Sequence, residues 1–248
     1  MQKVLTVDGS YTLFSKQYNQ HYHNPSDGAV HESLYKHVLP ALTHHEKKNE
    51  LSILDICFGL GYNTFTTLYW LLKTASNKKV SIYSPELDQN LIHNLQDFEY
   101  PKEFDFLKKL IKSLSLKGFY EDENVHVKIF IGDAREYLQN IQTKIDIVYQ
   151  DAFSSEVNRE LWTKEYFAQI KTLLNEDAIL TTYSTATPVR MGLHVNGFYM
   201  YENKSEFTRN GTLAFLKKQN RDFFIDMELK QQRNPEAKPF FDSCQENI

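Results

Sequence analysis

An aspartate and a phenylalanine follow an apolar run in IDIVYQDAF, residues 145–153. The run has the length and composition of a buried strand, so Asp151 and Phe153 stand at its carboxyl end. A carboxylate in this position can bind a cation or accept a proton, and an aromatic ring beside it can form the wall of a pocket. An aspartate here can also simply cap a turn. The pair therefore marks this edge as a candidate site.

An earlier strand-like run, LSILDICF, is followed by the turn FGLGYN, residues 58–63. Its two glycines allow the backbone to turn tightly and approach a ligand, and the next helix begins with amide groups that need partners. The turn is not the dinucleotide-binding GxGxxG pattern, because Thr64 stands where the third glycine is required. Taken alone, it is better explained as an ordinary link between strand and helix. The candidate ligand-binding residues of this segment are Asp55, Gly59, Gly61 and Asn63.

Two further strands end in acids. Glu86 closes the run KVSIYSPE, at a distance after the glycine turn that suits hydrogen bonding to ribose hydroxyls. Asp133 and Ala134 follow VHVKIFIG, and this aspartate can accept a hydrogen bond from the amino group of adenine. It can also cap the helix AREYL, and one carboxylate can do both. Each acid alone has an ordinary structural explanation, but four marked strand ends in sequence favour a ligand site.

Strands alternate with helical segments from about residue 50 to residue 182, which predicts an α/β fold with a mostly parallel sheet. Such sheets bind ligands at the carboxyl ends of their strands, where the strand order reverses. Ahead of this region, HESLYKHVLPAL (residues 31–42) has helical spacing, although Pro40 is expected to disturb its last turn. After it, YMYENKSEF and GTLAFLKK predict two late strands joined by an RNG turn. We expect an N-terminal β arm over residues 1–30, one α/β domain over 31–221, and a polar tail over 222–248.

The composition excludes several classes of protein. The 248 residues include 41% apolar side chains, enough for a substantial core, but no apolar stretch approaches the roughly 20 residues that span a bilayer. The N-terminus lacks a signal-peptide pattern. Cys57 and Cys244 are the only cysteines, and their spacing does not suit a metal or redox site. We expect a soluble, cytoplasmic protein that binds neither a membrane nor a metal.

The full pattern resembles the class I, Rossmann-like, S-adenosylmethionine-dependent methyltransferases, with a twisted sheet and helices on both faces. More narrowly, it resembles the methyltransferase half of the MnmC-type tRNA-modifying enzymes. That resemblance rests on DGS, GAVHES, FGLGYN, GDA, DAFSSEVNRELWT and VRMGLHVNGF. In the loop after the fourth strand, Ser155 and Arg159 stand where the family usually has proline. The length leaves no room for the family's FAD-dependent oxidase half, so a stand-alone methyltransferase is expected.

The resemblance implies N-methylation of the 5-aminomethyl group of a wobble uridine, with or without 2-thio, in a tRNA anticodon loop. It implies that the glycine turn lies under the methionine part of S-adenosylmethionine, that Glu86 holds the ribose and that Asp133 holds adenine. It also places Glu32 near the cofactor. Asp151 would bind the ammonium and take its proton, and Phe153 would pack against the base. Enzymes that make the aminomethyl precursor are further expected partners.

Three questions stay open in the sequence. Tyr22 and its flanking histidines are candidates for the pocket entrance, with plain packing as the alternative. A tRNA-binding face is as well explained by an ordinary solvated surface; its candidate residues are Lys108, Lys109, Lys112, Lys117, Lys204, Arg209, Lys217, Lys218 and Arg221. Two other functions remain: an aminopropyltransferase-like enzyme, for which only Glu156 and Glu160 offer additional acids, and a catalytically silent module that binds the cofactor or RNA.

Overall fold

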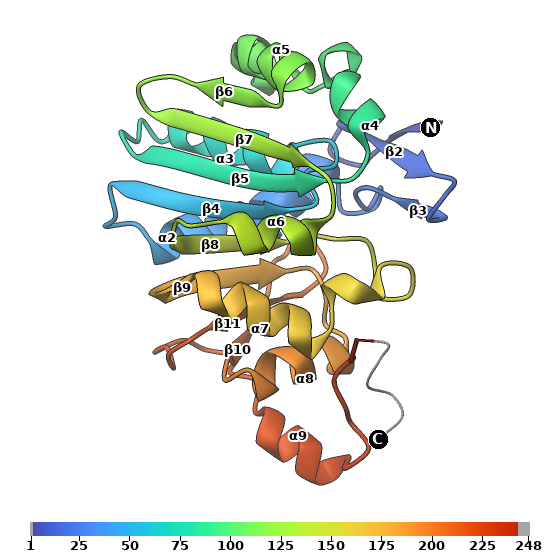
Figure 1. Cartoon of the computed structure of the whole chain (residues 1–248), viewed down its shortest axis with the longest axis vertical. Helices are drawn as coiled ribbons and strands as arrows, with labels where there is room; N and C mark the ends of the chain where they lie inside the picture. The colour runs from blue at the N-terminus through green and yellow to red at the C-terminus, as the bar shows by residue number, and fades with distance from the viewer. Residues whose placement is uncertain (1, 243–248) are drawn as a thin grey trace.

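A mostly parallel sheet of eight strands forms the centre of the computed structural model, which describes residues 2–242 (Figure 1). Six strands point the same way, while β6 and β11 run antiparallel to their neighbours. In spatial order the strands are β10 (Tyr199–Asn203), β11 (Gly211–Phe215), β9 (Leu174–Thr182), β8 (Ile145–Gln150), β4 (Glu50–Ile56), β5 (Lys79–Glu86), β7 (Val125–Ile131) and β6 (Phe119–Glu121).

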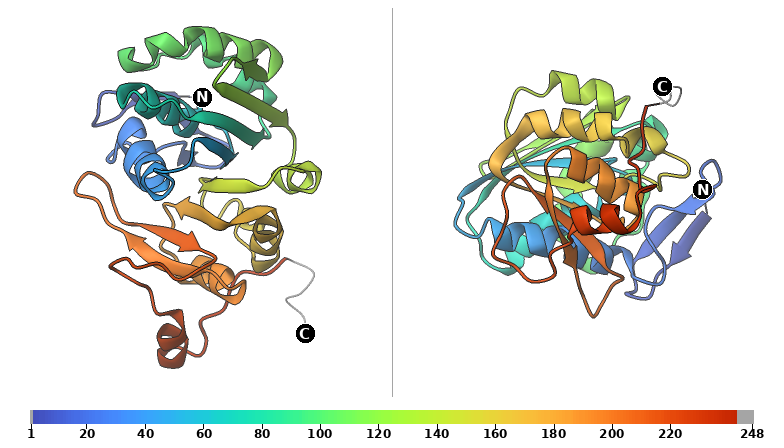
Figure 2. Two further views of the ribbon diagram at one scale, coloured as in Figure 1. Left: turned by 90° about the vertical axis from the view of Figure 1, so that its left-hand side faces the viewer. Right: turned by 90° about the horizontal axis from the view of Figure 1, so that it is seen from below.

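Helices cover both faces of this sheet (Figure 2), and each face has its own apolar core. One face is covered by α1 (Ala29–Glu32), the π-helical η1 (Ser33–Val38), α2 (Leu39–His44), α3 (Tyr62–Lys73), α4 (Gln89–His93) and α5 (Lys108–Lys117), with the 3-10 segments η2 (Leu95–Asp97) and η3 (Lys102–Leu107). The other is covered by α6 (Ala134–Asn140), α7 (Lys164–Leu173) and α8 (Thr187–Val195), with α9 (Met227–Arg233) beside α8. The expected α/β fold with helices on both faces is confirmed.

The order of the strands fixes where a ligand can bind. From β4 the chain moves outward through β5 to β7, then returns to place β8 on the other side of β4. This reversal lies between β4 and β8, so the loops after these two strands diverge and leave a crevice at their carboxyl ends. Asp55 and Asp151 stand at those two ends.

The N-terminal arm lies at the same edge (Figure 1). It is an antiparallel sheet of β1 (Gln2–Leu5), β2 (Tyr11–Ser15) and β3 (Gln20–His21). Gln20 joins it to the loop after β8: its side chain donates to Ser154 Oγ at 2.6 Å and accepts from the Ser154 amide at 3.1 Å. The arm therefore forms one wall of the crevice.

The expectation that Pro40 disturbs the last turn of its helix was wrong. The helical segments α1, η1 and α2 run without a break from residue 29 to residue 44, and Pro40 lies in the first turn of α2. The π-helical segment just before it changes the hydrogen-bond register, which is a common way to accommodate such a disturbance. Asn203 of β10 donates to the carbonyl oxygens of Tyr35 (3.0 Å) and Lys36 (3.1 Å), so the carbonyls opposite the proline still have partners.

The link between the two late strands also differs from the prediction. The strands β10 and β11 pair as expected, but residues 204–210 form a seven-residue loop instead of a tight RNG turn. The short strand β6 and the tail helix α9 were not predicted. Within residues 222–242, Ile225 and Met227 are buried against the second core, and Asp242 accepts two hydrogen bonds from Arg135 at 2.8 and 2.9 Å.

In the part of the chain that the structure describes, no helix is both long and apolar enough to cross a membrane. Across residues 2–242 there is likewise no group of three or more His, Cys, Asp or Glu side chains arranged to hold a metal ion.

Candidate active site

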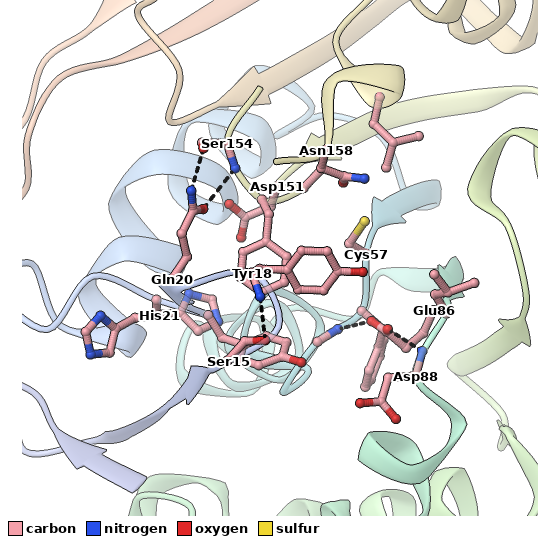
Figure 3. Close-up of a pocket in the computed structure, with 18 of the residues that line it drawn as sticks. Ser15, Tyr18, Gln20, His21, Cys57, Glu86, Asp88, Asp151, Ser154 and Asn158 are labelled. Carbon is pink, nitrogen blue, oxygen red and sulfur yellow. Dashed lines mark hydrogen bonds between the residues drawn. The ribbon is translucent and has the colours of Figure 1, made fainter. Parts of the chain in front are cut away.

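A cavity of about 1000 Å³ opens at the carboxyl edge of the sheet, between the strand ends and the N-terminal arm (Figure 3). Its volume lies at the upper end of the range usual for small-molecule sites. Nine of the predicted site residues line it: Tyr22, Glu32, Gly59, Asn63, Glu86, Asp133, Ala134, Asp151 and Phe153. The sheet topology thus brings together residues that are as far as 131 positions apart in the chain.

The carboxylate of Asp151 accepts a hydrogen bond from one side chain and is faced by a second, both from helices behind the sheet edge. Asn63, in the first turn of α3, donates from Nδ2 to Asp151 Oδ2 at 2.9 Å. His37, in η1, places Nε2 at 3.5 Å from Asp151 Oδ1. The Asp151 side chain is about 10% exposed, so it is fixed in orientation and still reaches the cavity.

His37 was not singled out from the sequence. Its side chain is completely buried, and its Nδ1 lies 2.8 Å from Thr181 Oγ1 of β9. Its Nε2 has no hydrogen-bond partner within residues 2–242 and faces the Asp151 carboxylate. One signal was available: His37 lies three residues after Leu34, on the apolar face of the predicted helix. A histidine on that face has to find a polar partner in the interior.

Asp55 lies beneath the cavity and does not line it. It is fully buried, and it accepts hydrogen bonds from Thr64 Oγ1 at 2.8 Å and from Asn63 Nδ2 at 3.3 Å. Burial raises the pKa of Asp55 to about 7, and the hydrogen bond from Thr64 only partly opposes this effect. Because the Asn63 amide contacts both Asp55 and Asp151, Asp55 supports the catalytic candidate through its neighbour.

Glu86 lies in the cavity wall at the end of β5, where the glycine turn donates a hydrogen bond to it. Each of its carboxylate oxygens accepts one backbone amide: Oε2 from Gly59 and Oε1 from Asp88, both at 2.8 Å. Burial raises the pKa of Glu86, although these backbone bonds favour its charged form. Each oxygen keeps a second lone pair for a ligand donor such as a hydroxyl.

The two glycines have different roles. Gly59 lines the cavity at φ +55°, and a Cβ there would meet the Tyr22 ring at 3.2 Å. Gly61 lies outside the lining at φ +75°, where a Cβ would come within 2.6 Å of Phe65. Its amide donates to the Phe58 carbonyl. Gly61 therefore shapes the turn from behind, and neither glycine amide is left without a partner.

Asp133 caps α6 with one of its two carboxylate oxygens. Its Oδ1 accepts from the amides of Arg135 (2.8 Å) and Glu136 (3.0 Å), while Oδ2 takes no part in the cap. Ala134 follows as the first residue of the helix and lines the cavity. The Asp133 carboxylate can therefore cap the helix with one oxygen and contact a ligand with the other at the same time.

Aromatic rings form the wall opposite the strand ends. The Phe153 ring lies 4.7 Å from Tyr18 and 5.0 Å from Tyr22, measured between ring centroids. Tyr18 was not predicted; burial and the charge of Glu86 raise its pKa. In the view of Figure 3 its ring lies between Asp151 and Glu86. Both tyrosines belong to the arm, so the arm supplies most of this wall.

Glu32 lines the cavity, but its carboxylate already contacts several protein groups. It accepts from Lys36 Nζ at 2.7 Å and from the Asn24 amide at 2.9 Å, and His23 Nδ1 lies at 3.5 Å. Burial acts to raise the pKa of Glu32, but the hydrogen bond from His23 and the charge of Lys36 outweigh it and hold that pKa far below its usual value. The arrangement anchors the arm to the helix.

The loop after β8 is ordered without the two prolines. The amides of Val157 and Asn158 both donate to the Ser154 carbonyl at 3.0 Å, which closes a turn around Ser155. The Arg159 guanidinium lies over the Phe240 ring at 4.7 Å. Trp162 is buried and donates from Nε1 to the Phe153 carbonyl at 2.8 Å, so it belongs to the core.

The candidate cations do not share one face. Arg209 lines the cavity, and Lys204 stands in the same loop. Lys217 and Lys218 follow the antiparallel β11, so they lie at the opposite edge of the sheet, where Lys217 pairs with Glu176. The lysines of α5 lie near the outer strands β6 and β7 and do not line the cavity.

The cofactor expected from the resemblance fits this arrangement. Glu86 and Asp133 provide acceptor atoms at one end of the cavity, as the hydroxyl and amino donors of a nucleoside require. Asp151 lines the same cavity beside the crevice between β4 and β8, and the aromatic wall completes the lining. The cavity therefore has room and chemistry for the cofactor and for part of a second ligand.

Comparison with known proteins shows the family to which the chain is similar. Residues 99–217 match the family model described as S-adenosyl-L-methionine-dependent methyltransferase. The crystal structure of MnmC2 from Aquifex aeolicus matches the whole chain with a TM-score of 0.85 and 31% identity, and the match covers 80% of that protein.

Two curated relatives are longer than this chain. An uncharacterized protein of Methanocaldococcus jannaschii is 29% identical over 220 residues, which is 86% of this chain and 58% of that protein. The tRNA 5-methylaminomethyl-2-thiouridine biosynthesis bifunctional protein MnmC of Leptospira interrogans is 26% identical over 253 residues, which is 96% of this chain and 37% of that protein.

Proposed function

The chain belongs to the MnmC-type family of S-adenosyl-L-methionine-dependent methyltransferases, and we propose that it methylates the 5-aminomethyl group of a tRNA wobble uridine, with or without 2-thio. The observation that carries this proposal is the position of Asp151. A single oriented carboxylate stands at the end of β8, next to an aromatic wall and in the same cavity as Glu86. This is an arrangement for an amine on a flat ring, placed beside a nucleoside-containing cofactor.

The proposed role of Asp151 follows from the positive charge of the substrate amine. An aliphatic primary amine is protonated near neutral pH, and only the free amine is a nucleophile. In this proposal the Asp151 carboxylate binds the ammonium and takes one proton from it. The Asn63 amide fixes the carboxylate on one side, and His37 Nε2 faces its other oxygen. The orientation of Asp151 is therefore set before the substrate arrives.

S-adenosylmethionine, when bound, supplies a methyl group on a sulfonium centre, which is already a good electrophile. Transfer would join the amine nitrogen to the methyl carbon and break the carbon–sulfur bond, and the electron pair of that bond would stay on sulfur. The positive charge would end on the secondary ammonium product, and Asp151 would stabilise it once the proton that it took has passed to solvent. Glu86 would hold the ribose hydroxyls, Asp133 and Ala134 would contact adenine, and the turn at Gly59 would lie beside the methionine part.

The aromatic wall would hold the uracil ring. Phe153 and Tyr22 are the proposed substrate contacts, and Tyr18 extends the same surface. A base must leave its stack to enter such a cavity, which costs least in a single-stranded loop. An anticodon loop provides that geometry. A tRNA substrate also places the proposed reaction in the cytoplasm, after the enzymes that make the aminomethyl precursor.

The direct test supplies the purified protein with labelled S-adenosylmethionine and tRNA from cells that lack the terminal methylation. Nucleoside mass spectrometry should then detect one added methyl on the 5-aminomethyl wobble uridine. Methyl transfer to a small amine instead, with none to tRNA, would favour the alternative of another small-amine transferase on the same fold. Cofactor binding with no transfer to either would contradict the proposed activity and favour a binding module.

A further inference from the structure

A cluster of three aromatic rings stands in the loop between β10 and β11 and on the helix beside it. The Phe207 ring is stacked on Tyr35 with centroids 4.5 Å apart and an angle of 16° between planes. His31 lies 5.8 Å from Tyr35 and 6.1 Å from Phe207. Phe207 remains 57% exposed, so one large face of a fixed ring is turned to solvent. We call the loop 204–210 together with His31 and Tyr35 the rim platform.

The strand directions place the rim platform beside the cavity. The strand β10 runs parallel to β9, so it ends at the carboxyl edge, where the loop begins. Arg209 of this loop lines the cavity, and its side chain is 72% exposed. The platform is therefore continuous with the site that holds Asp151.

Charge distinguishes this side of the cavity from the others. Glu156 and Glu160, in the loop after β8, and Asp88, after β5, line the remaining rim. A phosphate would be repelled there. Arg209 Nε lies 3.6 Å from Asp27, and that carboxylate also contacts Lys36 Nζ at 2.7 Å. Arg209 is thus the lining cation best placed to attract an anionic chain.

We propose that the rim platform binds the single-stranded RNA next to the target nucleotide, with a flanking base stacked on Phe207 and a phosphate at Arg209. This inference rests on the proposed tRNA substrate and specifies the surface that holds it. An exposed aromatic face is a sequence-tolerant support for any base, and an adjacent guanidinium suits the backbone phosphate. The other cation clusters do not adjoin the cavity, so they do not contribute to this contact.

The test measures binding of an anticodon stem-loop RNA by fluorescence anisotropy as a function of salt. Phe207→Ala should weaken binding roughly 5- to 150-fold, the usual range for loss of one base–aromatic stack. Phe207→Trp should restore it, because the flat face is kept. Arg209→Glu should weaken binding and lower the slope of log affinity against log salt by about 0.7 for each lost phosphate contact.

Lys47→Glu is the matched charge control. Lys47 is an exposed cation in the loop before β4, at the opposite edge of the sheet, so this variant should bind RNA like the wild type. Calorimetric affinity for S-adenosylmethionine should be unchanged in the Phe207 and Lys47 variants, which excludes a general loss of folding in them.

The outcomes separate the two proposals. If the wild type methylates tRNA but Phe207→Ala and Arg209→Glu bind and react normally, the platform is wrong and the proposed function stands. Weakening of equal size in Lys47→Glu would also overturn the platform, because it would indicate a diffuse electrostatic effect. If the wild type neither binds the stem-loop nor methylates tRNA, the proposed function fails, and the platform proposal fails with it.

Discussion

Asp151 illustrates how a single residue acquires a role from its neighbours. Its carboxylate is fixed by Asn63 from one helix and faced by His37 from another, at 2.9 and 3.5 Å. Neither neighbour is close to it in sequence. The pair determines which way the two oxygens point, and so which donor in the cavity they can meet.

We expect Asp151→Asn to lower the maximal rate of methyl transfer by about 100-fold or more, as is typical for loss of a proton-accepting group. Cofactor affinity measured by calorimetry should be retained. Part of the rate should return at alkaline pH, where the amine loses its proton without help. A variant whose rate stays near the wild-type value at neutral pH, or shows no alkaline recovery, would contradict the role given to Asp151.

Asp55 leads to a prediction about stability. Its pKa is raised from 3.8 to about 7 by burial, so the folded state retains the proton to higher pH than the unfolded state does. The corresponding stability is complete below pH 4 and is lost as the pH rises toward 7. Asp55→Asn removes this titration.

The free energy of unfolding of Asp55→Asn, relative to the wild type, should therefore increase by up to about 4 kcal/mol between pH 4 and pH 7, at about 1.4 kcal/mol for each pKa unit. Urea unfolding at several pH values measures this difference. A difference that is constant across the window would show that Asp55 titrates alike in the folded and unfolded states.

At the scale of elements, the helical run from residue 29 to residue 44 carries both Glu32 and His37 into the site. It reaches across the sheet because the π-helical segment and Asn203 together accommodate Pro40. The register of this helix determines whether His37 faces Asp151. The π-helical segment and Asn203, which accommodate Pro40, therefore also help to position His37 in the site.

Asn203→Ala should destabilise the protein by about 1–3 kcal/mol, because two partly buried carbonyls lose their donor. The cost should be smaller in a Pro40→Ala background, where the new amide can donate to the Lys36 carbonyl. Chemical unfolding of the four members of this double-mutant cycle measures the coupling. An identical cost in both backgrounds would mean that Asn203 does not compensate for the proline.

At the scale of the whole molecule, the described segments near both termini, residues 2–21 and 222–242, pack onto the central domain. The arm closes the cavity through Gln20, and the segment after residue 221 covers the second core with Ile225 and Met227. The bidentate contact between Arg135 and Asp242 fixes that segment close to α6. Both terminal segments therefore contribute to the stability of the domain.

Truncation after Arg221 should lower the free energy of unfolding by roughly 3–6 kcal/mol, since burial of an isoleucine or methionine contributes about 1.5–3 kcal/mol each. The double variant Ile225→Ala, Met227→Ala in the full chain should reproduce much of the loss. Thermal unfolding is the measurement. An unchanged midpoint in the truncated protein would show that the segment is dispensable for folding.

The parts of the site that depend on chain direction follow from the amino-acid sequence alone. Alternation of strands and helices requires a parallel sheet, and a parallel sheet brings all its strand ends to one edge. Glu86, Asp133 and Asp151 could therefore be placed together from the order of residues, because each follows an apolar run that ends at that edge.

The contacts made by packing depend on the tertiary structure. His37 reaches Asp151 across 114 positions, from a helix on the face of the sheet, and local periodicity carries no information about such pairs. Asp55 and Gly61 match the expected pattern but lie behind the cavity wall. Arg209 and Lys217 are equally basic in the sequence, yet the antiparallel strand β11 sends them to opposite edges of the sheet. The direction of each strand follows from the order of strands and helices along the chain. The neighbours of a side chain depend instead on how layers that are far apart in the sequence pack against each other.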